Sequence, residues 1–164
     1  MKVDFSGDEI KIFDFDELEA YRIARKMEQD GLHYYSRMKE DVSRPEIREV
    51  IEMLIEDEKE HLDLFEKKVE ELARKQGVED EGETLADIVD SKALDVLKDT
   101  TRVAEILCDP QEALRLGASV EKRSIAFYRE ILRTTEDTGG RAAIEDLIKQ
   151  EQDHLQKLNG LLGN

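Results

Sequence analysis

The chain has 164 residues, enough to bury one continuous apolar core, and a formal net charge of −16. Charged residues make up 40% of it and aromatic residues 5%, with two prolines and no tryptophan, a composition that favours a bundle of long helices. Because this negative charge repels phosphate groups, nucleic acid and anionic membranes are excluded as expected partners.

The N-terminal half of the chain predicts an arm followed by a helical hairpin. Residues 1–15 mix apolar and polar side chains without a helical period, so we expect an arm of undefined shape. A first helix is expected from about residue 16 to residue 41. Ser43 and the glutamate three residues later match a capping box, with a proline in the first turn, that begins a second helix. Gly77 is the expected stop of that helix, so the first hairpin covers residues 16–76.

Residues 77–108 are expected to form a long, partly helical crossover. Residues 77–84 are acidic and rich in turn-forming residues, which is typical of a solvated linker. Residues 85–108 carry apolar side chains at helical spacing and predict one or two short helices.

A second helical hairpin is predicted over residues 109–160. Asp109 is the expected cap of a helix that has proline in its first position and runs to about residue 134. Residues 138–140 (Thr-Gly-Gly) predict a break before the last helix. Two hairpins with short turns and one long connection predict an all-α four-helix bundle with the layout of ferritin-like folds. We expect residues 1–164 to form one such domain.

An internal repeat relates the two hairpins. When the second half is shifted back by 93 residues, it matches the first half without a gap. Two such hairpins can pack about a pseudo-two-fold axis, which makes the first and third helices antiparallel and the second and third parallel. A parallel pair needs a connection as long as the bundle, and the crossover is long enough. The matches that bear on chemistry are Glu28 with Glu121, Tyr35 with Tyr128, Glu58 with Glu151, and His61 with His154.

Each half of the repeat contains a Glu-x-x-His motif, which puts a carboxylate and an imidazole one turn apart on one helix face. Each motif also has a partner glutamate 30 residues upstream of its own glutamate, near the middle of the preceding helix. All six residues interrupt otherwise apolar faces, so they can meet in one layer of the bundle. They are Glu28, Glu58, His61, Glu121, Glu151 and His154.

The charge of this layer indicates metal binding. Four buried glutamates without counter-charge would be strongly destabilising or would stay protonated, whereas two divalent cations cancel their charge. A glutamate from each of two helices plus Glu-x-x-His from the other two is a recognised ligand set for two iron or manganese ions. The competing interpretation places these glutamates on the surface of a highly charged chain, which would leave a metal-free helical interaction module. The third histidine, His33, lies off the Glu28 face and is expected at the surface.

Two stretches carry a resemblance to a known family: Met27-Glu28-x-x-Gly31-x-x-x-Tyr35 before Glu58-x-x-His61, and Glu121-x-x-x-Ile125-x-Phe127-Tyr128 before Glu151-x-x-His154. The resemblance is to the erythrin domain of the rubrerythrin family, within the ferritin-like superfamily, and it covers about residues 16–160. Rubrerythrins also carry a rubredoxin-type Cys-x-x-Cys iron site and an extra glutamate three residues after the third-helix ligand. Here Cys108 is the only cysteine and Ser124 stands at that position.

The resemblance implies a role for each ligand of a di-iron centre. Glu28 and Glu121 would be terminal or switching ligands, and Glu58 and Glu151 would bridge the ions. Each histidine would supply one nitrogen to one iron. Manganese or a mixed pair of metals suits the same ligands.

The resemblance further implies that Tyr35 and Tyr128 donate hydrogen bonds to ligand carboxylates, and we predict a catalytic role for them in positioning or protonating the substrate. Core aromatic residues with a satisfied hydroxyl group are the other interpretation of these tyrosines.

The functional prediction is a non-haem di-iron oxidoreductase that reduces hydrogen peroxide or dioxygen with electrons from an external donor such as a rubredoxin-like protein. A ferroxidase or iron-handling protein is the alternative, and a homodimer is expected from the resemblance. One cysteine excludes an internal disulfide and a cysteine-based metal site, and we expect Cys108 to be a small buried residue. With neither a signal-like start nor an apolar run of membrane-spanning length, a cytoplasmic location is expected.

Overall fold

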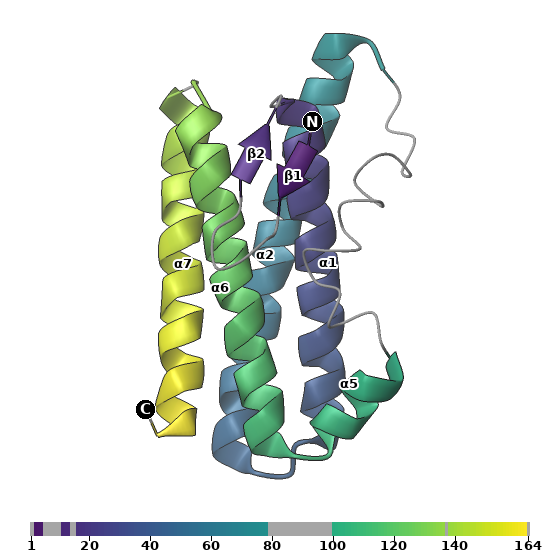
Figure 1. Ribbon diagram of the computed structural model, residues 1–164, viewed down its shortest axis with the longest axis vertical. Coiled ribbons are helices and arrows are strands. Elements are labelled where there is room, and N and C mark those ends of the chain that lie inside the picture. The colour runs from purple at the N-terminus through teal and green to yellow at the C-terminus, as the bar shows by residue number, and fades with distance from the viewer. Residues whose placement is uncertain (1, 5–10, 14–15, 79–99, 137, 164) are drawn as a thin grey trace.

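The computed structural model describes residues 2–4, 11–13, 16–78, 100–136 and 138–163. Four long helices lie side by side and make up most of these residues (Figure 1). The predicted all-α four-helix bundle is therefore confirmed. The four helices are α1 (Glu17–Asp41), α2 (Pro45–Gln76), α6 (Pro110–Thr134) and α7 (Thr138–Leu162).

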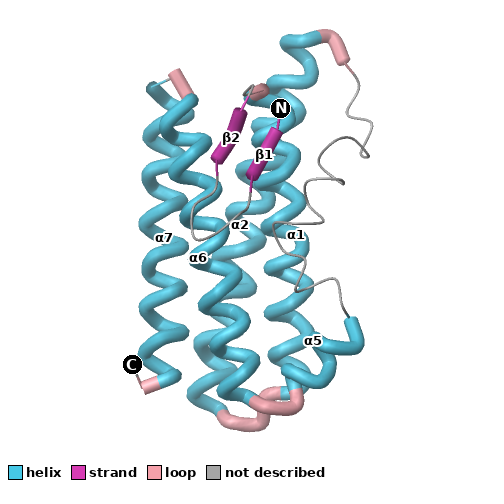
Figure 2. The backbone as a smooth tube through the Cα atoms, in the orientation of Figure 1, coloured by secondary structure: helices cyan, strands magenta, loops and turns pink. Residues whose placement is uncertain are grey.

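Three short elements accompany the bundle (Figure 2). Helix α5 (Thr100–Leu107) leads into α6 and is one of the short helices predicted for the crossover. Strands β1 (Lys2–Asp4) and β2 (Lys11–Phe13) pair antiparallel, with Val3 opposite Ile12. This hairpin replaces part of the shapeless arm that the sequence predicted. The predictions for residues 79–99 lie outside the described residues.

The directions of the four long helices follow the internal repeat. In Figure 1, α1 and α7 run down the page and α2 and α6 run up. Helices α1 and α6 are thus antiparallel and α2 and α6 parallel, as the pseudo-two-fold axis requires. Inter-helix contacts are concentrated within each hairpin, between α1 and α2 and between α6 and α7.

Several helix ends lie where the sequence placed them. The Asp109 carboxylate accepts a 2.8 Å hydrogen bond from the backbone N–H of Gln111 and caps α6. Gly77 ends α2 with φ of 69°, a left-handed conformation that glycine adopts without a Cβ clash. Asp16 likewise caps α1 by accepting from the Glu19 N–H at 2.9 Å.

Three predictions near helix ends are wrong. Helix α2 is capped by Arg44 instead of Ser43, and in the described part of the chain the Arg44 side chain makes no capping hydrogen bond. Residues 138–140 form the first turn of α7 instead of a break. The Arg141 guanidinium links α7 to the end of α6 by donating to the carbonyl oxygen of Thr135 at 2.9 Å. Cys108, just after α5, is exposed instead of buried.

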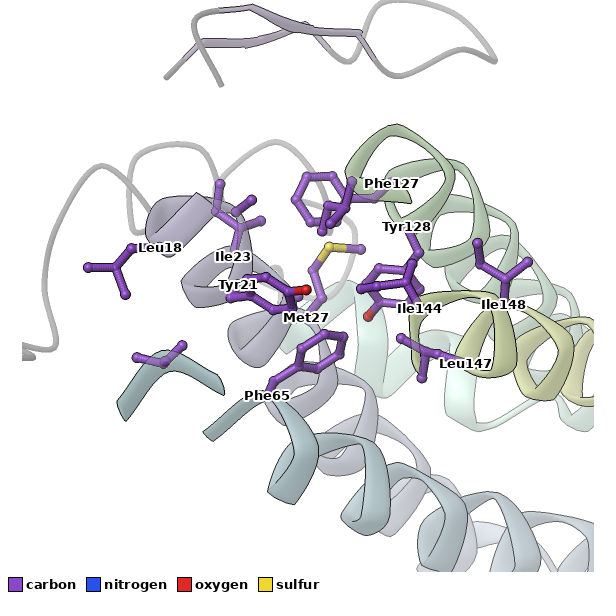
Figure 3. Close-up of a cluster of buried hydrophobic side chains, with 14 of the residues drawn as sticks. Leu18, Tyr21, Ile23, Met27, Phe65, Phe127, Tyr128, Ile144, Leu147 and Ile148 are labelled. Atoms are coloured by element: carbon purple, nitrogen blue, oxygen red, sulfur yellow. The ribbon is translucent and has the colours of Figure 1, made fainter. Parts of the chain in front are cut away.

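The apolar core is divided into two clusters with a polar layer between them. One cluster contains the N-terminal half of α1, the C-terminal half of α2 and the adjoining parts of α6 and α7 (Figure 3). There Phe65 stacks obliquely on Tyr128, with 5.5 Å between ring centroids. The second cluster contains the other halves of the helices and two residues of α5. Among the described helices, none combines the length and the apolar character needed to cross a membrane.

Candidate metal centre

The polar layer consists of the six predicted ligands. Each exposes 3% or less of its surface. Helices α1 and α6 each contribute one glutamate, and α2 and α7 each contribute a Glu-x-x-His pair, because a spacing of three residues puts both side chains on one helix face. The structure thus brings together Glu28, Glu58, His61, Glu121, Glu151 and His154.

One group of possible ligands is centred on His61. Its Nδ1 atom lies 3.2 Å from Glu151 Oε1 and 3.5 Å from Glu58 Oε2. Glu28 Oε2 is also 3.5 Å away. One ligand atom from each of these four residues lies within 4.8 Å of the others, a spacing that could hold a metal ion.

The second group is centred on His154 and mirrors the first. Its Nδ1 atom lies 3.2 Å from Glu151 Oε2 and 3.7 Å from Glu58 Oε1. Glu121 Oε2 is 4.0 Å away and occupies the place that Glu28 has in the first group. One ligand atom from each of these four residues likewise lies within 4.8 Å of the others.

Glu58 and Glu151 belong to both groups. Each turns one carboxylate oxygen toward His61 and the other toward His154. The two imidazole rings are stacked, with centroids 5.6 Å apart. A bridging ligand needs this placement, although bridging itself stays a prediction.

The hydrogen bonding of the layer fits bound cations. Both histidine Nδ1 atoms and both Glu151 carboxylate oxygens are buried and find no hydrogen-bond partner among the described residues. Buried polar atoms are almost always paired, because an unpaired one costs about 1–3 kcal/mol. The unpaired atoms include a nitrogen from each group and both oxygens of a shared glutamate, which are donor types that iron and manganese accept.

Two residues that the sequence analysis missed contact the far side of the imidazole rings. His154 Nε2 lies 3.1 Å from Asp57 Oδ2, and His61 Nε2 lies 3.2 Å from Gln150 Oε1. Asp57 directly precedes Glu58, and Gln150 directly precedes Glu151, so they occupy matching positions in the repeat. That match was a usable signal, but only the packing of α2 against α7 reveals which histidine each one contacts.

Hydrogen bonds from the hydroxyl groups of Tyr35 and Tyr128 link the two hairpins. The Tyr35 hydroxyl on α1 donates to Glu121 on α6, and the Tyr128 hydroxyl on α6 donates to Glu28 on α1. The predicted hydrogen bonds to ligand carboxylates are present, whereas a catalytic role for the tyrosines stays a prediction. Another buried tyrosine, Tyr34, donates to the Ala113 carbonyl oxygen at 2.6 Å and joins the same two helices.

The electrostatics of the metal-free layer are unfavourable for most of its carboxylates. Burial raises the pKa of Glu58, and the charges of Glu28 and Glu151 raise it further. Burial and the neighbouring glutamates also raise the pKa of Glu121 and of Glu151. The layer therefore retains protons that a divalent cation would displace.

The pKa values of Glu28 and His61 shift in the directions that favour the charged forms of these side chains. Burial opposes the charge of Glu28, but contacts with Glu58, His61 and Tyr128 outweigh it and lower the pKa of Glu28. Burial also opposes the charge of His61, but contacts with Glu151, Glu28 and Glu58 raise its pKa well above the usual range.

The structure also places two further residues that the sequence analysis named. Ser124 is buried, 6% exposed, one turn after Glu121. His33 is exposed on α1, as expected.

The fold and the layer together define the class of protein: a ferritin-like four-helix bundle with a buried carboxylate and histidine cluster suited to two metal ions. The family model described as Rubrerythrin matches residues 5–69 and 20–162 of this chain. Because the match covers most of the chain, the protein belongs to the rubrerythrin family. Comparison with curated proteins and with solved structures gave no match.

Proposed function

We propose that this protein is a non-haem di-iron oxidoreductase that reduces hydrogen peroxide or dioxygen with electrons from an external donor. The observation that carries the proposal is the duplicated cluster, in which Glu58 and Glu151 each turn one oxygen toward either histidine. The unpaired Nδ1 atoms of His61 and His154 support it, because no hydrogen bond among the described residues satisfies them.

The proposal assigns a role to each residue of the layer. Glu58 and Glu151, which belong to both groups, would hold both ions, and Glu28 and Glu121 would each hold one. When bound, two iron ions supply the electrons and the Lewis acidity that reduction of peroxide or dioxygen requires. The two apolar clusters on either side of the layer exclude bulk water from it.

Tyr35 and Tyr128 are proposed to orient the terminal carboxylates. Burial raises the pKa of Tyr35, and the charge of Glu121 adds to the shift. Burial and the charge of Glu28 raise the pKa of Tyr128 in the same way. Both hydroxyl groups therefore keep their protons at neutral pH and can donate to Glu121, to Glu28 or to a substrate oxygen.

Metal analysis tests the site directly. After iron-replete expression, we expect about two iron ions per chain, the number that the duplicated ligand set implies. Glu58→Gln removes the charge of a carboxylate shared by both groups and should lower the bound iron to below about one ion per chain. Glu60→Gln is the matched control, because Glu60 carries the same charge on the same helix but is exposed.

The reaction needs a separate test. The reduced, iron-loaded protein should consume hydrogen peroxide or dioxygen catalytically when given a rubredoxin-like electron donor, and Glu60→Gln should do the same. Glu58→Gln should lose this turnover together with its iron. Full iron occupancy without consumption of either oxidant would contradict the proposed reaction and leave the metal site standing. Less than about one ion per chain in the unaltered protein would instead favour a metal-free interaction module.

One observation favours a second candidate function, iron oxidation. The 164 residues contain only one cysteine, so they carry no rubredoxin-type site that could deliver electrons to the layer. A ferroxidase needs no such delivery, because its ferrous substrate supplies the electrons. This alternative predicts that aerobic addition of excess ferrous iron yields many oxidised ions per chain without any added donor. Oxidation that stops at about two ions per chain would favour the peroxide or dioxygen reductase.

The proposed oligomer is a homodimer, which the family resemblance implies. Native mass spectrometry of the loaded protein should give a mass of two chains.

A further inference from the structure

The two halves of the metal layer differ in the group that contacts the outer nitrogen of each histidine. His154 Nε2 faces the Asp57 carboxylate at 3.1 Å, and His61 Nε2 faces the Gln150 amide oxygen at 3.2 Å. These acceptors occupy the same position of the repeat and cross between α2 and α7 in the same way. The two contacts therefore have the same geometry but different chemistry, because the acceptor facing His154 is an anion and the acceptor facing His61 is neutral.

A carboxylate determines the tautomer of its histidine, and an amide does not. Ionised Asp57 can only accept a hydrogen bond, so it requires a proton on Nε2 of His154 and leaves the Nδ1 lone pair of a neutral ring facing the cluster. Gln150 offers both an oxygen acceptor and an NH2 donor, so it is compatible with either tautomer of His61. Binding an ion at His61 can therefore require a proton to leave Nδ1, which binding at a neutral His154 does not need.

The charge of Asp57 also makes His154 the stronger ligand. A hydrogen bond from a ring N–H to a carboxylate is about twice as strong as one to a neutral acceptor, and it raises the basicity of the other ring nitrogen. The remaining surroundings are similar, since each Nδ1 atom has three glutamate oxygens within 4.0 Å. The outer acceptor is thus a clear chemical difference between the two halves.

We propose that Asp57 and Gln150 are positioning residues that make the two metal positions unequal, so that the first ion binds at His154 and the second at His61. This inference rests on the proposed two-metal site and goes beyond it by ordering the two ions. A chain that holds a single ion then has it at the His154 position, and the ion at the His61 position is the one that exchanges more readily.

Titration of the metal-free protein with Co(II), followed by visible absorption, tests the order. We expect two resolved binding steps in the unaltered protein. Glu121→Gln removes a ligand of the His154 group and should weaken the first step, whereas Glu28→Gln should weaken the second. The reverse assignment would overturn the proposed order.

Isosteric substitutions of Asp57 and Gln150 test whether the charge of the outer acceptor causes the binding order. Asp57→Asn keeps an acceptor, removes the charge and adds an NH2 donor like that of Gln150, so it should weaken the first step about 10- to 100-fold and merge the two steps. Gln150→Glu should strengthen the second step by a similar factor. The double exchange Asp57→Asn/Gln150→Glu should restore two steps with the opposite dependence on Glu28 and Glu121. Glu60→Gln again controls for a charge change on α2 and should leave both steps unchanged.

The outcomes separate this inference from the proposed function. Two bound Co(II) ions with the same step separation in Asp57→Asn and Gln150→Glu would overturn the ordering and keep the metal site. Failure of the unaltered protein to bind Co(II) would remove the site on which both statements depend. If Asp57→Asn does not fold, as judged by circular dichroism, Gln150→Glu alone decides, because unchanged binding in that variant overturns the inference.

Discussion

At the scale of single residues, the hydrogen bond from Tyr35 to Glu121 depends on a glycine in the facing helix α6. A Cβ atom added to Gly117 would lie 3.3 Å from both the ring and the hydroxyl of Tyr35 and 3.5 Å from Leu158. Glycine inside a helix costs about 1 kcal/mol relative to alanine, so Gly117 lowers the stability of α6 itself. The close approach of Tyr35 to Glu121 offsets that cost.

Gly117→Ala should therefore destabilise the protein despite its higher helix propensity. We expect a loss of about 1–2 kcal/mol in the free energy of unfolding, because overpacking a buried contact costs about 1–3 kcal/mol. Gly160→Ala is the matched control: apart from its chain neighbours and the local backbone of α7, no atom of the described residues lies within 4 Å of the added Cβ, so stability should be unchanged or rise by up to about 1 kcal/mol. Urea denaturation of the metal-free proteins measures both. A stabilised Gly117→Ala variant would show that Tyr35 moves without cost.

At the scale of elements, the helices begin in two different ways. Helices α1 and α6 begin at aspartates whose carboxylates accept backbone N–H groups. Helix α2 begins at Arg44, which has the backbone conformation of a cap residue, φ −79° and ψ 119°, without a capping side chain in the described structure. The neighbouring Arg44–Glu46 ion pair is 4.0 Å long and exposed, so it adds little. The first turn of α2 is therefore weaker than that of α6.

Substitutions at the caps should have opposite effects on stability. Asp109→Ala should lower the free energy of unfolding by about 1 kcal/mol, because it leaves the first N–H groups of α6 without their acceptor. Arg44→Ser should raise it by about 0.5–1 kcal/mol by supplying the missing acceptor to α2. Chemical denaturation measures both changes. No gain from Arg44→Ser would mean that water already satisfies this helix end.

At the scale of the whole molecule, the metal layer lies between two apolar clusters and joins the two hairpins. Without cations, the raised pKa values of Glu58, Glu121 and Glu151 make the folded state bind more protons than the unfolded state above pH 4.5, their unperturbed pKa. Stability must then fall as the pH rises. The raised pKa of His61 acts in the same direction above pH 6.5. The lowered pKa of Glu28 acts in the opposite direction, below its unperturbed value of 4.5.

The metal-free protein should therefore lose stability as the pH is raised from about 5 to about 8. We expect its Tm to fall across this range, and the loaded protein to melt at a higher Tm that falls less. Melting curves with and without a chelator, recorded in about 1 M salt to screen the surface charge, provide the measurement. The fall should be smaller in Glu58→Gln than in Glu60→Gln. A metal-free Tm that rises over this range would contradict the assignment of raised pKa values.

Much of the fold and the candidate site follows from local sequence patterns. The apolar period and the Asp109 cap predicted α6, Gly77 predicted the end of α2, and the repeat selected the ligands because each Glu-x-x-His motif has an equivalent in the other half. The errors have local causes as well. Ser43 lies one residue too early to cap a helix that begins with proline at its first position. The strand pairing of Val3 with Ile12 depends on contacts that helical periodicity cannot report.

The sequence by itself determined which residues could meet in the layer, because residue spacing alone sets the helix face on which a side chain lies. Only the tertiary structure decided how they meet. The packing of α2 against α7 brings Asp57 to His154 and Gln150 to His61, and the packing of α1 against α6 brings Tyr35 to Glu121. These contacts join residues 86 to 97 positions apart, so they depend on how the hairpins are oriented in space.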